Sequence, residues 1–223
     1  MAAADDLFVG FQSEDCGHFR CGGLVAGQRE VGVLIDGHGG HHAPALRIPH
    51  GNQSARLPRL VRRAGPDHTV ETIAGLSPRA RAADVPVITV QQQGCGDVLP
   101  ELAPQDGESV VTKTCADAFL DTGLDETLIR LGVTEVLVTG FATENCVETT
   151  ARQALSRGYD LVLVVDGHTT SVRPQSTDFA PPDQSIAHHN EIYRHIDFPA
   201  RSVRALPATG IDFTAPKRDA PER

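Results

Sequence analysis

The stretch Glu135-Val136-Leu137-Val138-Thr139-Gly140-Phe141-Ala142-Thr143-Glu144-Asn145-Cys146 joins an apolar run to a cysteine through a short polar segment. The residues from Glu135 to Thr139 predict a buried strand. The residues from Asn145 to Arg157, followed by Gly158, predict a helix with a glycine at its end. Cys146 therefore stands in the first turn of a helix that follows a strand, an order typical of α/β folds with parallel strands.

The same pattern extends outward from this unit in both directions. Further strands are predicted at Val31–Ile35, Pro86–Val90, Ser109–Thr112 and Leu161–Val165, and a further helix at Leu124–Leu131. The strands are almost continuously apolar, which favours burial on both faces. We therefore predict an α/β fold, a three-layer α/β/α sandwich with a Rossmann-like, mostly parallel six-stranded sheet.

The length of 223 residues suits one domain with short additions at its ends. Residues 1–30 are rich in glycine and polar residues with little periodicity, and they predict an N-terminal arm. The domain itself is expected over 31–206. Residues 207–223 contain Pro207, Pro216 and Pro221 among charged residues, and they predict an exposed, flexible C-terminal tail.

Composition excludes several classes of function. The formal net charge of −9 and the lack of a dense basic stripe argue against a nucleic-acid partner. The apolar runs are too short to span a membrane, and the N-terminus lacks the pattern of an export signal, so we expect a cytoplasmic protein. Five cysteines in such a chain favour free thiols over a disulfide framework.

Three chemically active side chains follow predicted strands. Ligands of open parallel sheets bind at the carboxyl ends of the strands, so Asp36, Lys113 and Cys146 are expected to meet at one edge. A helix start stabilises a thiolate, and Lys113 at the end of an apolar strand needs a negative partner. Together they form a candidate proton-handling triad, although each alone is also compatible with a surface charge or a small buried residue.

Spaced motifs then give a specific resemblance. Lys113 to Phe119, followed by Thr122, Leu124 and Leu128, and then Gly140 to Val147 with Thr150 and Ala151, resemble isochorismatase-like cysteine hydrolases. The resemblance implies a triad of Asp36, Lys113 and Cys146. It also implies a cis peptide between Phe141 and Ala142, an oxyanion hole from the backbone N–H groups of Ala142 and Cys146, no organic cofactor, and a homo-oligomer.

The chain also departs from the family pattern. The residues after Asp36 are Gly37-His38-Gly39-Gly40-His41-His42, which alter the floor of the pocket. The segment Gln91 to Asp97 lacks the histidine of a nicotinamidase zinc cluster, so no metal site is predicted. A metal at His38, His41 and His42, or at Cys16, His18 and Cys21, is the less favoured alternative. Candidate substrate-binding residues are His38, His41, Phe119, Phe141, His168 and Thr169.

These features predict an enzyme that hydrolyses an amide, ureido or lactam C–N bond of a small molecule through a thioester. Two alternatives stay open. One is a cysteine-independent vinyl ether hydrolase in which Asp36 is the general acid. The other is a catalytically silent binding or assembly protein, which the unusual His-Gly segment and the N-terminal region suggest.

Overall fold

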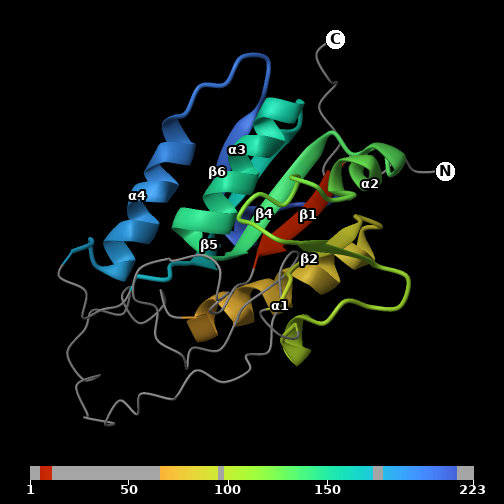
Figure 1. Cartoon of the computed structure of the whole chain (residues 1–223), viewed down its shortest axis with the longest axis horizontal. Coiled ribbons are helices and arrows are strands. Elements are labelled where there is room, and N and C mark those ends of the chain that lie inside the picture. Colours follow the sequence, from red (N-terminus) through yellow and green to blue (C-terminus); the bar gives the residue numbers. More distant parts are fainter. Residues whose placement is uncertain (1–5, 12–65, 95–97, 173–177, 215–223) are drawn as a thin grey trace.

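The computed structural model describes residues 6–11, 66–94, 98–172 and 178–214 (Figure 1). Its strands and helices follow in the order β1 (Asp6–Phe11), α1 (Pro66–Ala82), β2 (Val87–Gln92), β3 (Ser109–Lys113), α2 (Leu124–Arg130), β4 (Glu135–Phe141), α3 (Glu148–Arg157), β5 (Asp160–Thr169), α4 (Pro182–His195) and β6 (Val203–Leu206). Short helical turns occupy Pro100–Leu102, Thr143–Val147 and Ala208–Gly210.

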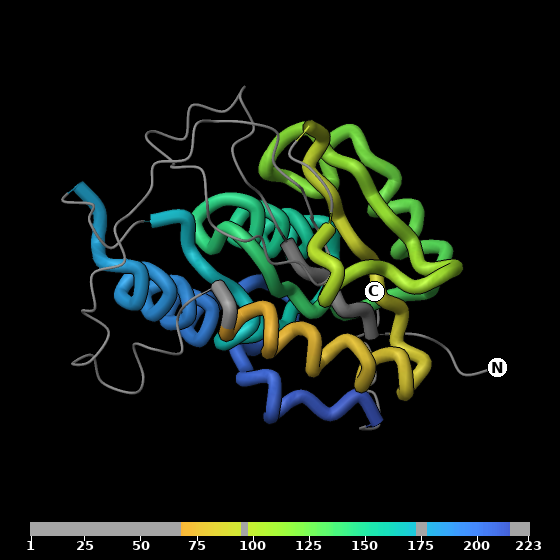
Figure 2. The backbone as a smooth tube through the Cα atoms, turned by 90° about the horizontal axis from the view of Figure 1, so that it is seen from below, coloured from red at the N-terminus to blue at the C-terminus, as the bar shows by residue number. Residues whose placement is uncertain are grey.

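All six strands form one parallel sheet in the order β3-β2-β1-β4-β5-β6. Helix α1 lies on one side of the sheet and α3 lies on the other (Figure 2). The central strands β2, β4 and β5 are almost wholly buried, as their apolar runs predicted. The predicted α/β/α sandwich with a parallel six-stranded sheet is confirmed.

The N-terminal region differs from the expectation of an arm over residues 1–30. Its segment Asp6–Phe11 is β1 and pairs with β2 on one side and β4 on the other. This segment is a short apolar run, which suits a strand inside a parallel sheet that is covered on both faces. Val31–Ile35, predicted to be the first strand, lies outside the described residues.

The helices begin and end close to the predicted positions. Helix α2 begins at Leu124 as predicted and buries Leu124 and Leu128 fully. Helix α3 is followed by Gly158, which has a φ of 98° in the left-handed region that glycine adopts without strain. Its start differs from the prediction, because a π-helical turn at Thr143–Val147 precedes the α-helix at Glu148.

The C-terminal region is also more ordered than expected. Ala208 and Ile211 are buried, and Phe213 packs against the core. The guanidinium of Arg79, on α1, donates to the backbone oxygens of Ala208 and Ile211. Part of the predicted tail is therefore packed on α1, since these apolar side chains have a core surface to cover; residues 215–223 lie outside the described part.

Strand β5 contains a bulge that shifts its register against β4. Val138 pairs with Leu163, but the next pairs join Gly140 to His168 and Phe141 to Thr169. The extra residues on β5 shift the local register and bend the strand. Gly167 lies within this bulge, where a Cβ atom would stand 2.8 Å from Cγ1 of Val164 and 3.2 Å from Cγ2 of Thr139.

In the described segments we find no helix that is both long enough and apolar enough to cross a bilayer.

Replacing Gly167 by alanine is expected to lower the free energy of unfolding by about 1–3 kcal/mol, because the added methyl overlaps Val164. Denaturant unfolding followed by circular dichroism measures the change. The control is Gly75→Ala in α1, where an added Cβ meets no described atom within 4 Å. This control should be neutral or stabilising by up to about 1 kcal/mol. Equal effects of the two substitutions would contradict a close-packed bulge.

Candidate active site

The carboxyl ends of neighbouring strands bring the polar residues of the site together. Strand β2 ends at Gln92, and β3 ends at its register partner Lys113. Strand β4 ends at Phe141, which pairs with Thr169 at the end of β5. Parallel strands place all these ends at one edge of the sheet, where ligands of such folds bind.

Lys113 is fully buried and hydrogen-bonded. Its Nζ donates to Oε1 of Gln92 at 2.6 Å, to the backbone oxygen of Cys115 at 3.0 Å and to Sγ of Cys146 at 3.2 Å. An ammonium group has three protons to donate, and the described residues supply these three acceptors for it. Two of the acceptors are neutral, and the third is a sulfur that can carry a negative charge.

Cys146 lies in a turn with unusual backbone geometry. The peptide bond between Phe141 and Ala142 is cis, as the resemblance implied, and Gly140 before it has a φ of 110°. The backbone oxygen of Ala142 accepts from the N–H groups of Asn145 at 3.0 Å and Val147 at 3.2 Å. We call the π-helical segment Thr143–Val147 the cysteine turn. It holds the Cys146 side chain, which is 5% exposed, against Lys113.

A series of hydrogen-bonded side chains connects the cysteine turn to β5 and α4. Oγ1 of Thr143 lies 2.8 Å from Nδ1 of His168, and Nε2 of that ring lies 2.9 Å from Oδ1 of Asn190. The Asn190 amide nitrogen donates to the backbone oxygen of Val165 at 3.0 Å. Burial lowers the pKa of His168 to about 4, so its imidazole is neutral near pH 7.

The carboxylates of Glu144 in this turn and of Glu148 directly after it make further contacts. The Glu144 carboxylate accepts hydrogen bonds from the Thr170 hydroxyl at 2.7 Å, the Ser171 N–H at 2.9 Å and the Ser171 hydroxyl. Directly after the turn, the hydroxyl of Tyr193, on α4, lies 3.1 Å from Oε2 of Glu148, the first residue of α3, and 3.2 Å from its backbone oxygen. The turn is therefore attached to β5, to the residues after it and to α4.

The segment between β3 and α2 is attached to α3 beside the site. Oγ1 of Thr150 accepts from the Ala118 N–H at 3.0 Å and donates to the Ala116 oxygen at 3.3 Å. The same segment carries the Cys115 oxygen that contacts Lys113. Thr150, part of the motif that gave the resemblance, thus helps to hold an acceptor of the buried ammonium.

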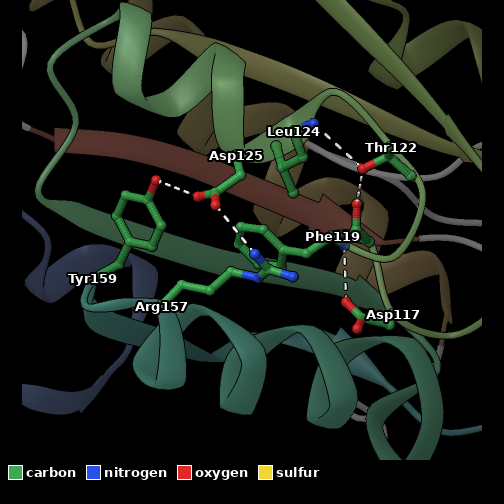
Figure 3. A network of polar contacts seen from close by, with 8 residues as sticks. Asp117, Phe119, Thr122, Leu124, Asp125, Arg157 and Tyr159 are labelled. Atoms are coloured by element: carbon green, nitrogen blue, oxygen red, sulfur yellow. Dashed lines mark hydrogen bonds and ion pairs between the residues drawn. The ribbon is translucent and has the colours of Figure 1, made fainter.

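The structure places the predicted substrate-binding residues in different surroundings. Phe141 is half-buried at the strand ends, whereas His168 and Thr169 are buried. Phe119 is a core residue that stacks on Tyr159 with ring centroids 6.1 Å apart, beneath the Arg157 guanidinium at 5.0 Å (Figure 3). The predicted residues Asp36, His38, His41 and His42 lie outside the described part.

Several residues of the site were not predicted from the sequence. Gln92 contacts Lys113, and Asn190 contacts His168. Thr143 and Glu144 join the cysteine turn to His168 and Thr170. Gln92 closely follows the predicted strand Pro86–Val90, and Glu144 lies two residues before Cys146. Their positions along the chain therefore pointed to the site. Asn190 lies on α4, and the packing of this helix brings it to His168.

No group of three or more histidine, cysteine or acidic side chains arranged to hold a metal ion is found within residues 66–94, 98–172 and 178–214. The cluster of Cys16, His18 and Cys21 falls outside these ranges, as do the histidines after Asp36. The expectation of no metal therefore stays a prediction for the whole chain.

Comparison with known proteins places this geometry in a family. The model of the isochorismatase domain matches residues 59–180. A protein named secreted isochorismatase effector from Verticillium dahliae is 31% identical over 151 residues, which cover 62% of this chain and 72% of that protein. Because that relative is named as secreted, the cytoplasmic location expected here stays a prediction.

Two further similarities agree with the fold and the site. A streptothricin hydrolase from Streptomyces noursei is 38% identical over 117 residues, which cover 48% of this chain and 42% of that protein; the matched part is less than half of this relative. The crystal structure of an isochorismatase from Pseudomonas putida KT2440 superposes with a TM-score of 0.58 at 30% identity, covering 66% of this chain and 78% of that one. The family match over more than half of the chain, together with this fold, shows that the chain belongs to the isochorismatase-like superfamily of hydrolases.

Proposed function

We propose that this chain is a cysteine-dependent hydrolase of an amide, ureido or lactam C–N bond in a small molecule. The observation that carries the proposal is the contact of 3.2 Å between Nζ of Lys113 and Sγ of Cys146, both buried. A buried cation beside a thiol favours the thiolate, which is the nucleophilic form. The similarity to a streptothricin hydrolase supports a small-molecule substrate of the lactam class.

In the proposed reaction the Cys146 thiolate attacks the carbonyl carbon of the substrate, forming a C–S bond. The carbonyl oxygen becomes an oxyanion, held by the backbone N–H groups of Ala142 and Cys146. The C–N bond then breaks, and the leaving nitrogen takes a proton from Asp36, which had accepted the thiol proton. Water attacks the thioester and releases the acid, so one water is consumed for each bond that is cleaved.

The acid–base role of Asp36 depends on sequence alone. Asp36 follows the apolar run Val31–Ile35, whereas β1 is formed by Asp6–Phe11, and Glu14 and Asp15 are the first carboxylates after β1 along the chain. The resemblance assigns the role to Asp36. Each of these carboxylates follows an apolar run, so matched substitutions at both places decide between them.

Cys146→Ala is expected to reduce hydrolysis of amide, ureido and lactam test compounds by at least about 10³-fold, because no other group forms the thioester. The matched control is Cys115→Ala, which removes a half-buried thiol two residues from Lys113. Circular dichroism checks that both variants fold. Undiminished turnover by Cys146→Ala would rule out the covalent mechanism and favour a vinyl ether hydrolase. Wild-type protein inert towards C–N and vinyl ether compounds would instead favour the binding alternative.

Lys113→Met is expected to move the pH at which Cys146 is half-maximally alkylated upward by about one to three units, since the nearby cation is lost. Peptide mapping after brief treatment with iodoacetamide between pH 5 and 9 gives this profile. Cys115 in the same digest is the internal control and should shift little. If the two cysteines have the same profile in the wild-type protein, Lys113 does not stabilise a thiolate.

Asp36→Asn is expected to lower kcat by roughly 10²-fold or more, the usual effect of losing a general acid–base group. Asp15→Asn and Glu14→Gln are the matched controls and should retain activity. Loss of activity in one of these controls, with full activity in Asp36→Asn, would transfer the acid–base role to the carboxylates after β1.

A further inference from the structure

His168 follows the β5 bulge and has both ring nitrogens engaged inside the protein. The sequence suggested a substrate contact, yet the side chain is 2% exposed and bonded to Thr143 and Asn190. We propose that His168 is a positioning residue: in its neutral tautomer with the proton on Nε2, it accepts the Thr143 hydroxyl and fixes the cysteine turn. The catalytic part of this inference rests on the proposed function, whereas the tautomer and the thiol reactivity do not.

The tautomer follows from the neighbouring hydrogen bonds. Nδ2 of Asn190 donates to the Val165 oxygen, which directs Oδ1 of the same amide toward His168. An amide oxygen only accepts, so Nε2 of His168 carries a proton and donates to it. The neutral ring then has a lone pair on Nδ1, which accepts from the Thr143 hydroxyl at 2.8 Å.

Burial keeps the ring neutral. The pKa of His168 is lowered to about 4, chiefly by complete burial and also by the charge of His189, while the contact with Asn190 and the charges of Asp166 and Glu144 oppose the shift. Protonation of Nδ1 would replace the acceptor for Thr143 by a second donor. The contact with Thr143 therefore needs the neutral form, which the surroundings favour throughout the pH range of an ordinary assay.

The backbone explains how the contact between Thr143 and His168 affects the position of the reacting groups. The β5 bulge pairs His168 with Gly140, next to the cis peptide Phe141–Ala142. Thr143 follows that peptide directly and begins the turn that ends beyond Cys146. A lost bond at Thr143 thus loosens both the proposed oxyanion donor Ala142 and the nucleophile, and small displacements of such groups are costly for catalysis.

Long-range proton–nitrogen NMR of the wild-type protein, labelled with ¹⁵N at histidine, tests the tautomer directly. We expect His168, assigned by its absence from His168→Gln, to show a protonated Nε2 and an unprotonated Nδ1 from pH 8 down to about pH 4.5, below the usual histidine pKa of about 6.5. A proton on Nδ1, or titration near pH 6.5, would overturn the proposal.

Thr143→Val and Thr143→Ser test the effect on the turn. Thr143→Val keeps the shape and loses the hydroxyl, so kcat and the alkylation rate of Cys146 are each expected to fall about tenfold while KM changes less than about twofold. Thr143→Ser keeps the donor and should restore most of both rates. The matched control is Ser77→Ala, which removes a buried hydroxyl that donates to the Ile73 oxygen in α1; it should leave both rates unchanged.

The outcomes separate this inference from the proposed function. If Thr143→Val keeps wild-type rates, or if Thr143→Ser is as impaired as Thr143→Val, then His168 does not position the turn. If Cys146→Ala retains turnover, the proposed function fails, but the alkylation rates and the tautomer still decide the role of His168. Should Thr143→Val not fold, the rates of Thr143→Ser and the wild-type NMR spectrum decide whether His168 positions the turn.

Discussion

The burial of the Lys113 ammonium is the constraint on which the site depends. A fully buried cation is costly unless acceptors and a negative charge surround it. Within the described residues, acceptors come from the end of β2 at Gln92, the segment after β3 at Cys115, and the cysteine turn at Cys146. The parallel register of β2 and β3 and the turn after β4 bring these acceptors within about 3 Å of Nζ, so the folded sheet and the Cys146 thiol are linked.

The conformation of the cysteine turn depends on β5 and α4, which supply none of the proposed reacting groups. Its first residues bond to His168, Thr170 and Ser171, which follow the β5 bulge. Helix α4 adds Asn190 behind His168 and Tyr193 against Glu148. A π-helical turn is an uncommon conformation, and such conformations persist where surrounding contacts define them. The polar contacts from β5 and α4 supply that definition here.

Much of the fold was predictable because long apolar runs identify buried parallel strands. The same logic found Lys113 and Cys146, since each follows such a run. It failed for β1, because Asp6–Phe11 lies in a region rich in glycine and polar residues, which favoured an arm over a strand. It also failed for Ile211 and Phe213, whose isolated apolar side chains have no periodicity around them. Gln92 and Asn190 were missed because their roles arise from register and helix packing between distant segments.

Phe119 and His168 show why residue type alone does not identify a substrate contact. Both were predicted to contact substrate, and both are buried inside the protein. The Phe119 ring fills the space beneath Arg157, whose guanidinium pairs with Asp125, and Asp125 also accepts from the Tyr159 hydroxyl at 2.7 Å (Figure 3). This network fixes the segment between β3 and α2, which presents the Cys115 oxygen to Lys113. Phe119 therefore supports the surroundings of Lys113, and His168 supports those of Cys146. A motif that this chain shares with known hydrolases is thus explained by support of the reacting groups as well as by contact with substrate.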